Sequence, residues 1–355
     1  MSAPAAEQPD AGTAGRPRVV AVDPRDEALF PAWSAVTTAV LRELRPDDDQ
    51  PPLAEQRAAA LAGLPERRPA ELVELVLALD GRDRPVGAGR LELPQRDNTH
   101  VAYVELHVPA DARRRGTGTA LLEALAARGR AADRTLLMTE LDESPELADR
   151  SPGRRFLTAH GFTCALEEVR RDLALPPDPA RLAELHRACS PHAAEYDVVT
   201  WRDRCPDPLL EGRAELGRAM STDVPLGDLD WQEETWDGER VRERERLLAE
   251  QGRTCVVAAA VHRPTGELVA FTELVARPAA PRQVQQWETM VRADHRGHRL
   301  GTLVKIEALR RLGEALPGAR TVATGNAAGN THMIAVNEAL GFVPNGTVTE
   351  WQRPL

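Results

Sequence analysis

The chain has 355 residues, 42% of them hydrophobic, which is enough for two domains that each bury a core. Its formal net charge of −10 argues against a nucleic-acid partner, which would require a basic face. No apolar run reaches membrane-spanning length, and residues 1–15 lack the basic start and apolar stretch of a signal peptide, so we expect a disordered tail and a cytoplasmic protein without a membrane partner.

Residues 16–175 have the pattern of a mixed α/β domain. Apolar spacing and turn residues predict its elements in chain order, including a hairpin around the turn Asp80–Arg84. The predicted strands cover 18–22, 72–79, 85–93, 100–108, 135–139 and 162–173. The predicted helices cover 26–44 and 52–64, with a third beginning near Thr119 and a fourth ending at His160.

Residues 176–355 repeat this order after a proline-rich linker at 176–179. Strands are expected at 197–201, 254–261, 267–275, 284–291 and 321–324, and helices at 208–220, 238–251, 302–312 and 331–340. The segment between Asp223 and Glu239 is unusually acidic and carries Trp231 and Trp236. It is interpreted either as a solvated loop or as a negative field that attracts a cationic substrate.

The two halves contain the same motif. Residues 103–125 read YVELHVPADARRRGTGTALLEAL, and residues 286–309 read QWETMVRADHRGHRLGTLVKIEAL. At an offset of 183 positions, Arg113 falls on Arg296 and Gly118 on Gly301. A Gly-Phe pair also recurs, at 161–162 and 341–342. This order and spacing indicate two copies of one domain joined head to tail.

The repeated motif predicts a phosphate site. A strand that enters an Arg- and Gly-rich turn and then a helix leaves unpaired backbone N–H groups at the positive end of that helix. Glycine lets a pyrophosphate approach the main chain, and arginine adds charge-assisted hydrogen bonds. One such turn is often only a solvated loop, but its repetition favours binding. The candidate residues are Val108, Arg113, Arg114, Arg115, Gly116, Thr117, Gly118 and Thr119, and Met290, Val291, Arg296, Gly297, His298, Arg299, Leu300, Gly301 and Thr302.

A strand ending in Val, an Arg-x-x-Gly-x-Gly turn that opens a helix, and a terminal Gly-Phe together resemble the GNAT superfamily of acyl-CoA-dependent N-acetyltransferases. The resemblance covers nearly the whole chain and is closest to double-GNAT proteins of the mycothiol-synthase type. The first half keeps Arg113, Gly116 and Gly118, whereas the second has Arg299 at the first glycine position. The resemblance implies two tandem GNAT domains whose mixed sheets pack against each other, acetyl-CoA as cosubstrate, no metal, and acetyl transfer to a primary amine of a small molecule.

The resemblance also distinguishes the halves. Family members often carry an Asn that contacts the pantetheine arm and a Tyr that protonates the departing thiolate, eleven and four residues before the Gly-Phe pair. The second half has Asn330 and Asn337 at these places, and Asn326 nearby, whereas the first half has Arg150 and Leu157. We therefore expect the second half to be catalytic and the first to be a second CoA site or a scaffold. A helix cap is the alternative role for Asn330.

Acetyl transfer also needs an N–H group for the thioester oxygen and a proton acceptor. The resemblance places the N–H near Val291. Glu288 lies three residues earlier and is the predicted base, with Glu273 as a rival and a structural role as the alternative for both. Three histidines are candidates for phosphate contacts. Three tryptophans are candidates for an acceptor pocket or for the core. These side chains are His295, His298 and His332, and Trp231, Trp236 and Trp287.

Other features of the composition are less specific. The four cysteines show no paired spacing and predict neither a disulfide framework nor a zinc site. Lys305 is the only lysine, a bias typical of GC-rich coding as in actinobacteria. The acceptor and the oligomeric state are not predicted. Two alternatives remain open, namely another acyl-CoA acting on an antibiotic-type metabolite, and a CoA-binding protein without catalysis.

Overall fold

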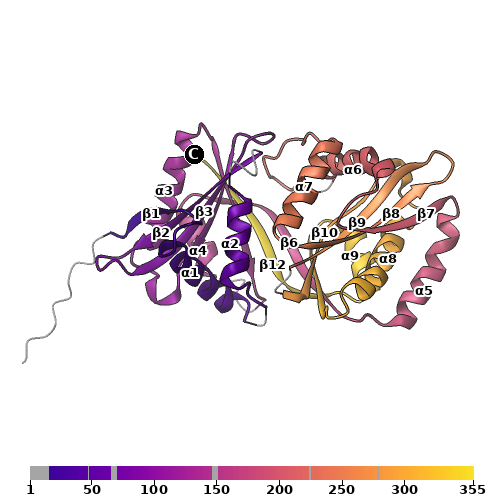
Figure 1. Cartoon of the computed structure of the whole chain (residues 1–355), viewed down its shortest axis with the longest axis horizontal. Helices are drawn as coiled ribbons and strands as arrows, with labels where there is room; N and C mark the ends of the chain where they lie inside the picture. The colour runs from indigo at the N-terminus through magenta and orange to yellow at the C-terminus, as the bar shows by residue number, and fades with distance from the viewer. Residues whose placement is uncertain (1–15, 47, 65–69, 146–150, 224, 278–279) are drawn as a thin grey trace, which may run out of the picture.

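The computed structural model describes residues 16–355 except 47, 65–69, 146–150, 224 and 278–279. The predicted disordered tail at 1–15 lies outside the described residues. Figure 1 shows two α/β lobes side by side, one from each half of the chain, with strands β6, β12 and β10 at the junction. No helix within the described ranges is long and apolar enough to cross a membrane.

The first half folds in the predicted order of strands and helices. Its strands are β1 (Arg18–Val22), β2 (Glu71–Leu79), β3 (Pro85–Pro94), β4 (Val101–His107), β5 (Leu136–Glu143) and β6 (Thr163–Ala174). Its helices are α1 (Leu29–Leu44), α2 (Leu53–Ala62), η1 (Ala110–Ala112), α3 (Thr117–Ala131) and α4 (Pro152–Ala159).

The second half repeats this order and adds α5 (Pro179–Cys189) and η2 (Ser190–Ala193) at its start. Its strands are β7 (Tyr196–Arg202), β8 (Thr254–His262), β9 (Glu267–Arg277), β10 (Ala280–Val291), β11 (Thr321–Ala327) and β12 (Val343–Pro354). Its helices are η3 (Asp207–Leu209), α6 (Leu210–Asp223), α7 (Gly238–Glu250), η4 (Ala293–His295), α8 (Leu300–Ala315) and α9 (Thr331–Leu340).

The expectation of two sheets packed against each other is wrong, because the strands form one 12-stranded sheet. Its order is β1-β2-β3-β4-β5-β12-β6-β11-β10-β9-β8-β7. β12 pairs antiparallel with both β5 and β6, and β6 pairs antiparallel with β11. Each half therefore leaves a gap one strand wide before its own last strand, and the last strand of the other half fills it. Filling the gaps removes two open sheet edges, which explains why the sheets join edge to edge.

Helices cover both faces of the sheet. In the first half, α3 and α4 bury residues such as Leu121 and Leu157 on one face, and α1 buries Phe30 and Trp33 on the other. In the second half, α8 and α9 pack with α5 on one face, and α6 and α7 cover the opposite face with residues such as Leu216. The turns that begin α3 and α8 thus lie at equivalent places in the two halves.

The acidic segment between α6 and α7 docks on the first half. Asp228 N donates to Ala165 O at 2.8 Å, and Gln232 N donates to Asn98 Oδ1 at 2.7 Å. Trp231 packs against the apolar group that contains Met138. The corresponding segment of the first half, between α1 and α2, reaches the second half, where Arg282 donates to Asp49 at 2.8 Å. The two segments therefore hold the halves together from both sides.

Candidate active site

The two Arg- and Gly-rich turns have the same backbone conformation. Arg113 and Arg296 end the short helices η1 and η4 with φ of −69° in both cases. Two later positions in each turn are left-handed. They are Arg114 (φ 61°) and Gly116 (φ 81°) in the first half, and Gly297 (φ 88°) and Arg299 (φ 58°) in the second. Arg299 therefore takes the same left-handed role as Gly116, and its presence does not alter the turn.

In both turns an arginine side chain forms a hydrogen bond with a backbone carbonyl earlier in the chain. Arg113 Nε donates to Val108 O at 2.9 Å, and Arg296 Nε donates to Val291 O at 3.2 Å. The remaining guanidinium groups are also engaged, Arg113 with Glu43 at 2.8 Å and Arg296 with Asp223 at 3.1 Å. Both arginines therefore stabilise the turn. The N–H groups that begin α3 and α8 lack intrahelical partners and are the groups that fit a phosphate.

The turns differ in what lies above them. A side chain at Gly118 would meet the Phe156 ring at 2.9 Å, whereas one at Gly301 would meet only Val291, at 3.7 Å. The Thr119 hydroxyl also has a hydrogen-bond partner, His160 Nε2, at 3.1 Å. The start of α3 thus contacts Phe156 and His160, whereas an added Cβ at Gly301 has room, although Gly301 itself is buried.

The sheet opens beside each turn. β4 and β5 pair only from Val101 to Tyr103, and β10 and β11 pair only from Gln283 to Gln285, so the strand pairs separate toward the turns. In the second half a β-bulge adds to this, because Trp287 and Glu288 both lie opposite Glu273 of β9. β3 and β4 pair without a register shift. A bulge leaves backbone groups without ladder partners, which suits binding of a thioester oxygen near Val291.

The asparagines predicted in the second half form a chain of hydrogen bonds. Lys305 Nζ donates to Asn337 Oδ1 at 2.8 Å, and Asn337 Nδ2 donates to Asn326 Oδ1 at 2.6 Å. Asn326 belongs to the part of β11 that has separated from β10. Asn330 lies at the start of α9, where its Oδ1 accepts from Met333 N at 3.2 Å. The structure thus brings Asn326 and Asn337 together and gives Asn330 a capping bond.

Glu288, the predicted base, lies in a buried group of four charges with Glu273. Arg213 Nη2 is 3.3 Å from Glu273 and 3.2 Å from Glu288, and Arg244 is 3.1 Å from Glu288 and also bonded to Glu273. Burial raises the pKa of Glu273. Burial also favours a higher pKa for Glu288, but the charges and hydrogen bonds of Arg244 and Arg213 have the larger effect and lower the pKa of that carboxyl. A carboxylate held by two guanidinium groups is a weak proton acceptor.

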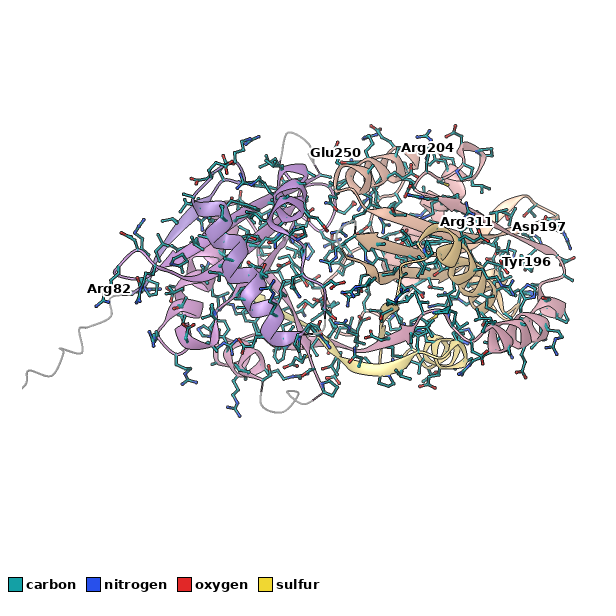
Figure 2. All side chains as sticks on the ribbon, turned by 60° about the horizontal axis from the view of Figure 1, so that its bottom comes forward. Arg82, Tyr196, Asp197, Arg204, Glu250 and Arg311 are labelled. Atoms are coloured by element: carbon teal, nitrogen blue, oxygen red, sulfur yellow. The ribbon has the colours of Figure 1, made fainter. Side chains whose placement is uncertain are left out.

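The other candidate side chains are dispersed. His295 is buried and 2.9 Å from the Tyr196 hydroxyl, and Figure 2 shows Tyr196 at the outer end of the second half, far from the junction. His332 is exposed at the start of α9, and Trp287 is 39% exposed beside Arg244. Trp287 therefore does not belong to the core, and its role in an acceptor pocket stays a prediction. Met290 is buried in the core under α6 and α7.

The remaining turn residues divide by exposure. Arg114 and Arg115 are exposed, and Thr117 and Thr302 are buried. Leu300 is buried in the α8 core, and His298 is half-buried with its Nδ1 3.0 Å from His192 O. No group of three or more His, Cys, Asp or Glu side chains in the described ranges could hold a metal ion. The four cysteines are free thiols.

A cavity of about 380 Å³ lies between the halves on the sheet face that carries α1. Gln285 and Ala323, the last paired residues of β10 and β11, line it, so it meets the point where these strands separate. Acidic side chains of the first half outnumber the arginines of its charged lining, one of which, Arg277, comes from the second half. The acidic side chains are Asp48, Asp49, Glu140, Asp142 and Glu168, opposed by Arg45, Arg170 and Arg277.

Two carboxyl groups in this cavity were missed by the sequence analysis. Burial and the nearby Asp142 raise the pKa of Glu140 to about 7. Burial also raises the pKa of Glu168, and its Oε2 lies where a side chain at Gly325 would need space, 2.6 Å from the position of an added Cβ. Glu168 comes from β6 of the first half but lies beside β11 of the second. No local pattern marks it, because its place depends on the pairing of the two halves.

The chain matches the model of the acetyltransferase (GNAT) family at residues 33–162 and 224–342. These matches cover both halves and more than half of the chain, so the chain belongs to this family of acyltransferases. Within the family it is a tandem GNAT protein, as both matches and the solved structures below agree. No curated protein matches the chain.

Solved structures of similar proteins share the whole arrangement. A tandem GNAT protein from the clavulanic acid biosynthesis pathway is 28% identical, with a TM-score of 0.74 over 96% of this chain and 98% of that chain. A GCN5-related N-acetyltransferase from Sphaerobacter thermophilus is 14% identical, with a TM-score of 0.64 over 96% of both chains. A putative acetyltransferase from Pyrococcus horikoshii is also 14% identical, with a TM-score of 0.55 over 96% and 90%. The last two support the fold alone.

Proposed function

We propose that the protein transfers an acetyl group from acetyl-CoA to a primary amine of a small molecule, and that the second half carries the reaction. The observation that carries this proposal is the opening between β10 and β11. On one side of it lie the start of α8, where an added Cβ at Gly301 meets only Val291, and the linked amides of Asn326 and Asn337. On the other side lies the acid-lined cavity. A thioester and an amine can therefore approach from opposite faces of the sheet.

The residues near the opening fit this cosubstrate. In the second half, the backbone N–H groups from Gly297 to Thr302 would hold the diphosphate, and the amide of Asn326, bonded to the buried Asn337, would contact the pantetheine arm. Bound there, acetyl-CoA supplies an activated acyl group on a thiol leaving group. The first half is a scaffold in this proposal, because Phe156 covers Gly118 and the groups beneath it are apolar.

An acceptor amine must lose a proton before it attacks the thioester. We assign this step to Glu168 rather than to the predicted base Glu288. The Glu168 carboxyl faces the cavity, has no hydrogen bond or ion pair to a described residue, and has a raised pKa, whereas Glu288 is bonded to two arginines. The acidic lining would also attract a cationic amine.

Two experiments test the proposal. Calorimetric titration with acetyl-CoA should show binding, and an assay of thiol release with a panel of amines should show turnover. Gly301→Trp should abolish both, because the new side chain fills the space at the start of α8, whereas Gly118→Trp should retain both. Thermal melting shows whether each variant is folded. Binding without turnover on any amine would support a CoA-binding protein, and loss of activity only in Gly118→Trp would assign catalysis to the first half.

A second candidate function is acyl transfer in specialised metabolism with a different acyl-CoA. The observation that favours it is the 28% identity to a tandem GNAT protein of the clavulanic acid pathway, which covers nearly both chains. Adding a panel of acyl-CoA donors to the same thiol-release assay separates the two candidates. Faster turnover with a longer acyl donor than with acetyl-CoA would favour the second.

A further inference from the structure

Lys305 is fully buried in the core of the second half. Its side chain is 2% exposed, and its ammonium group lies 5.8 Å from the centre of the Phe342 ring. Burying a lysine without a carboxylate costs free energy, so such residues are rare in cores. The first half has Leu122 at the equivalent position of α3, also buried. The fold therefore accepts an apolar side chain here, and packing does not explain the lysine.

The polar surroundings of Lys305 consist of amides. Among the described residues, its hydrogen-bond partner is Asn337 Oδ1, at 2.8 Å. Asn337 is itself completely buried, and its Nδ2 donates to Asn326 Oδ1 at 2.6 Å. Asn326 is half-buried and lies beyond the last pair between β10 and β11. The chain of bonds therefore runs from the core of α8 to the opening of the sheet.

The direction of this chain follows from the chemistry of lysine. As an ammonium group Lys305 can only donate, so in that form Asn337 must turn its oxygen toward Lys305 and its Nδ2 toward Asn326, as it does here. Asn326 must then accept with its oxygen, which leaves its own Nδ2 without a protein partner in the described ranges. Without Lys305, both amides could reverse, and Asn326 could present an oxygen at the same place.

We propose that Lys305 is a positioning residue for acyl-CoA, which fixes the Asn337 and Asn326 amides so that Asn326 presents N–H groups to the carbonyl oxygens of the pantetheine arm. This inference rests on the proposed function of the second half. N–H groups complement amide and thioester carbonyls, whereas a reversed Asn326 would place oxygen against oxygen. The lysine itself stays in the core and does not touch the cosubstrate.

A double-mutant cycle on the full-length chain tests this role. The affinity for acetyl-CoA is measured calorimetrically for the wild type, Lys305→Met, Asn326→Ala and the double variant. Methionine keeps the volume of the lysine stem but has no donor. We expect Lys305→Met to raise Kd about tenfold, as the loss of one directed hydrogen bond would. The double variant should bind no more weakly than Asn326→Ala, because both changes remove the same contact.

The matched control is Leu122→Met at the equivalent position of the first half, which should leave Kd unchanged. Lys305→Gln, which keeps an N–H donor, should recover part of the affinity. A Lys305→Met variant that is folded by thermal melting and binds within twofold of the wild type would overturn the inference, as would additive effects in the cycle. If the wild type itself binds no acetyl-CoA, the proposed function fails and the inference fails with it. If the wild type binds and Lys305→Met binds equally well, only the inference fails, so the two failures are distinguishable.

Discussion

At the scale of single residues, the site depends on which charges have partners. Glu288 was predicted as the base from its position before Val291, but Arg213 and Arg244 hold it in a buried group. These arginines come from α6 and α7, which lie outside the repeated motif, so no residue spacing indicates the pairing. Asn326 and Asn337 were predicted separately, and the structure places them in one hydrogen bond.

Glu288→Gln and Glu168→Gln should therefore affect different properties. The first removes one of the two carboxylates that hold Arg213 and Arg244, and should lower the free energy of unfolding by about 1 to 3 kcal/mol. The second should change stability little but lower kcat by about 100-fold or more, because a proton acceptor is lost. Chemical denaturation and initial-rate assays measure the two effects. A Glu168→Gln variant with wild-type kcat would remove the proposed role of Glu168.

Lys305 makes stability depend on pH in a defined direction. Burial lowers its pKa to about 7, from 10.5 in the unfolded chain. Between these values the unfolded state binds more protons, so the contribution of Lys305 becomes more favourable as pH rises from about 7 to 10.5. Below pH 7 its full penalty remains. Lys305→Met should therefore stabilise the protein most at pH 6 to 7, with a gain that falls toward pH 10.

Urea unfolding of the wild type and of Lys305→Met at matched pH values isolates the contribution of Lys305 to the free energy of unfolding, because the other groups titrate equally in both proteins. The carboxyls of Glu140 and Glu350, whose pKa values are raised by desolvation to about 7 and 8, change stability in the opposite direction but cancel in the difference. A difference between the two proteins that does not vary from pH 6 to 10 would contradict the burial of a charged lysine.

At the scale of elements, the turn before each long helix keeps its shape through two left-handed positions. The motif match marked Arg299 as a departure in the second half, yet the structure gives Gly116 and Arg299 the same conformation. Each turn thus has one glycine and one arginine in left-handed positions, in opposite order. A motif records residue types, whereas the backbone requires a conformation that arginine can also adopt at a cost.

Replacing glycine by alanine should have opposite effects on stability at two positions of the second half. Gly297 has φ of 88°, so Gly297→Ala strains the turn and should lower the free energy of unfolding by about 1 to 2 kcal/mol. Gly313 lies on the exposed face of α8 with open space around it, and Gly313→Ala should raise stability by about 0.5 to 1 kcal/mol. Guanidinium unfolding curves of the two variants compare them directly. A stabilising Gly297→Ala would contradict the left-handed assignment.

At the scale of the whole molecule, most of the fold could be predicted, but the pairing of the halves could not. The repeat and the order of most strands and helices are visible in the sequence, although α5 and β12 are absent from the predicted elements. The last strands β6 and β12 have the same local pattern whichever copy they pair with, so no residue spacing decides the partner. The cavity and Glu168 were missed for the same reason, since strands from both halves form that surface.

Separate halves should not behave as independent domains. Residues 16–175 alone leave the space between β5 and β6 without β12, and residues 176–355 leave the space between β11 and β12 without β6. Each half should aggregate or form dimers when produced alone, whereas halves produced together should co-purify as one folded complex. Size-exclusion chromatography and thermal melting measure this. A monomeric first half with a cooperative transition would contradict the shared sheet.

The interleaved end strands also constrain how the two copies can diverge. A substitution in β6 changes the strand that pairs with β11 of the other copy, and Glu168 is an example of a side chain that lies beside the repeat that does not encode it. After duplication, neither copy could be discarded once its terminal strand had become part of its twin. A copy that binds no ligand is then still retained by selection, because the remaining copy would lose a strand from the middle of its sheet.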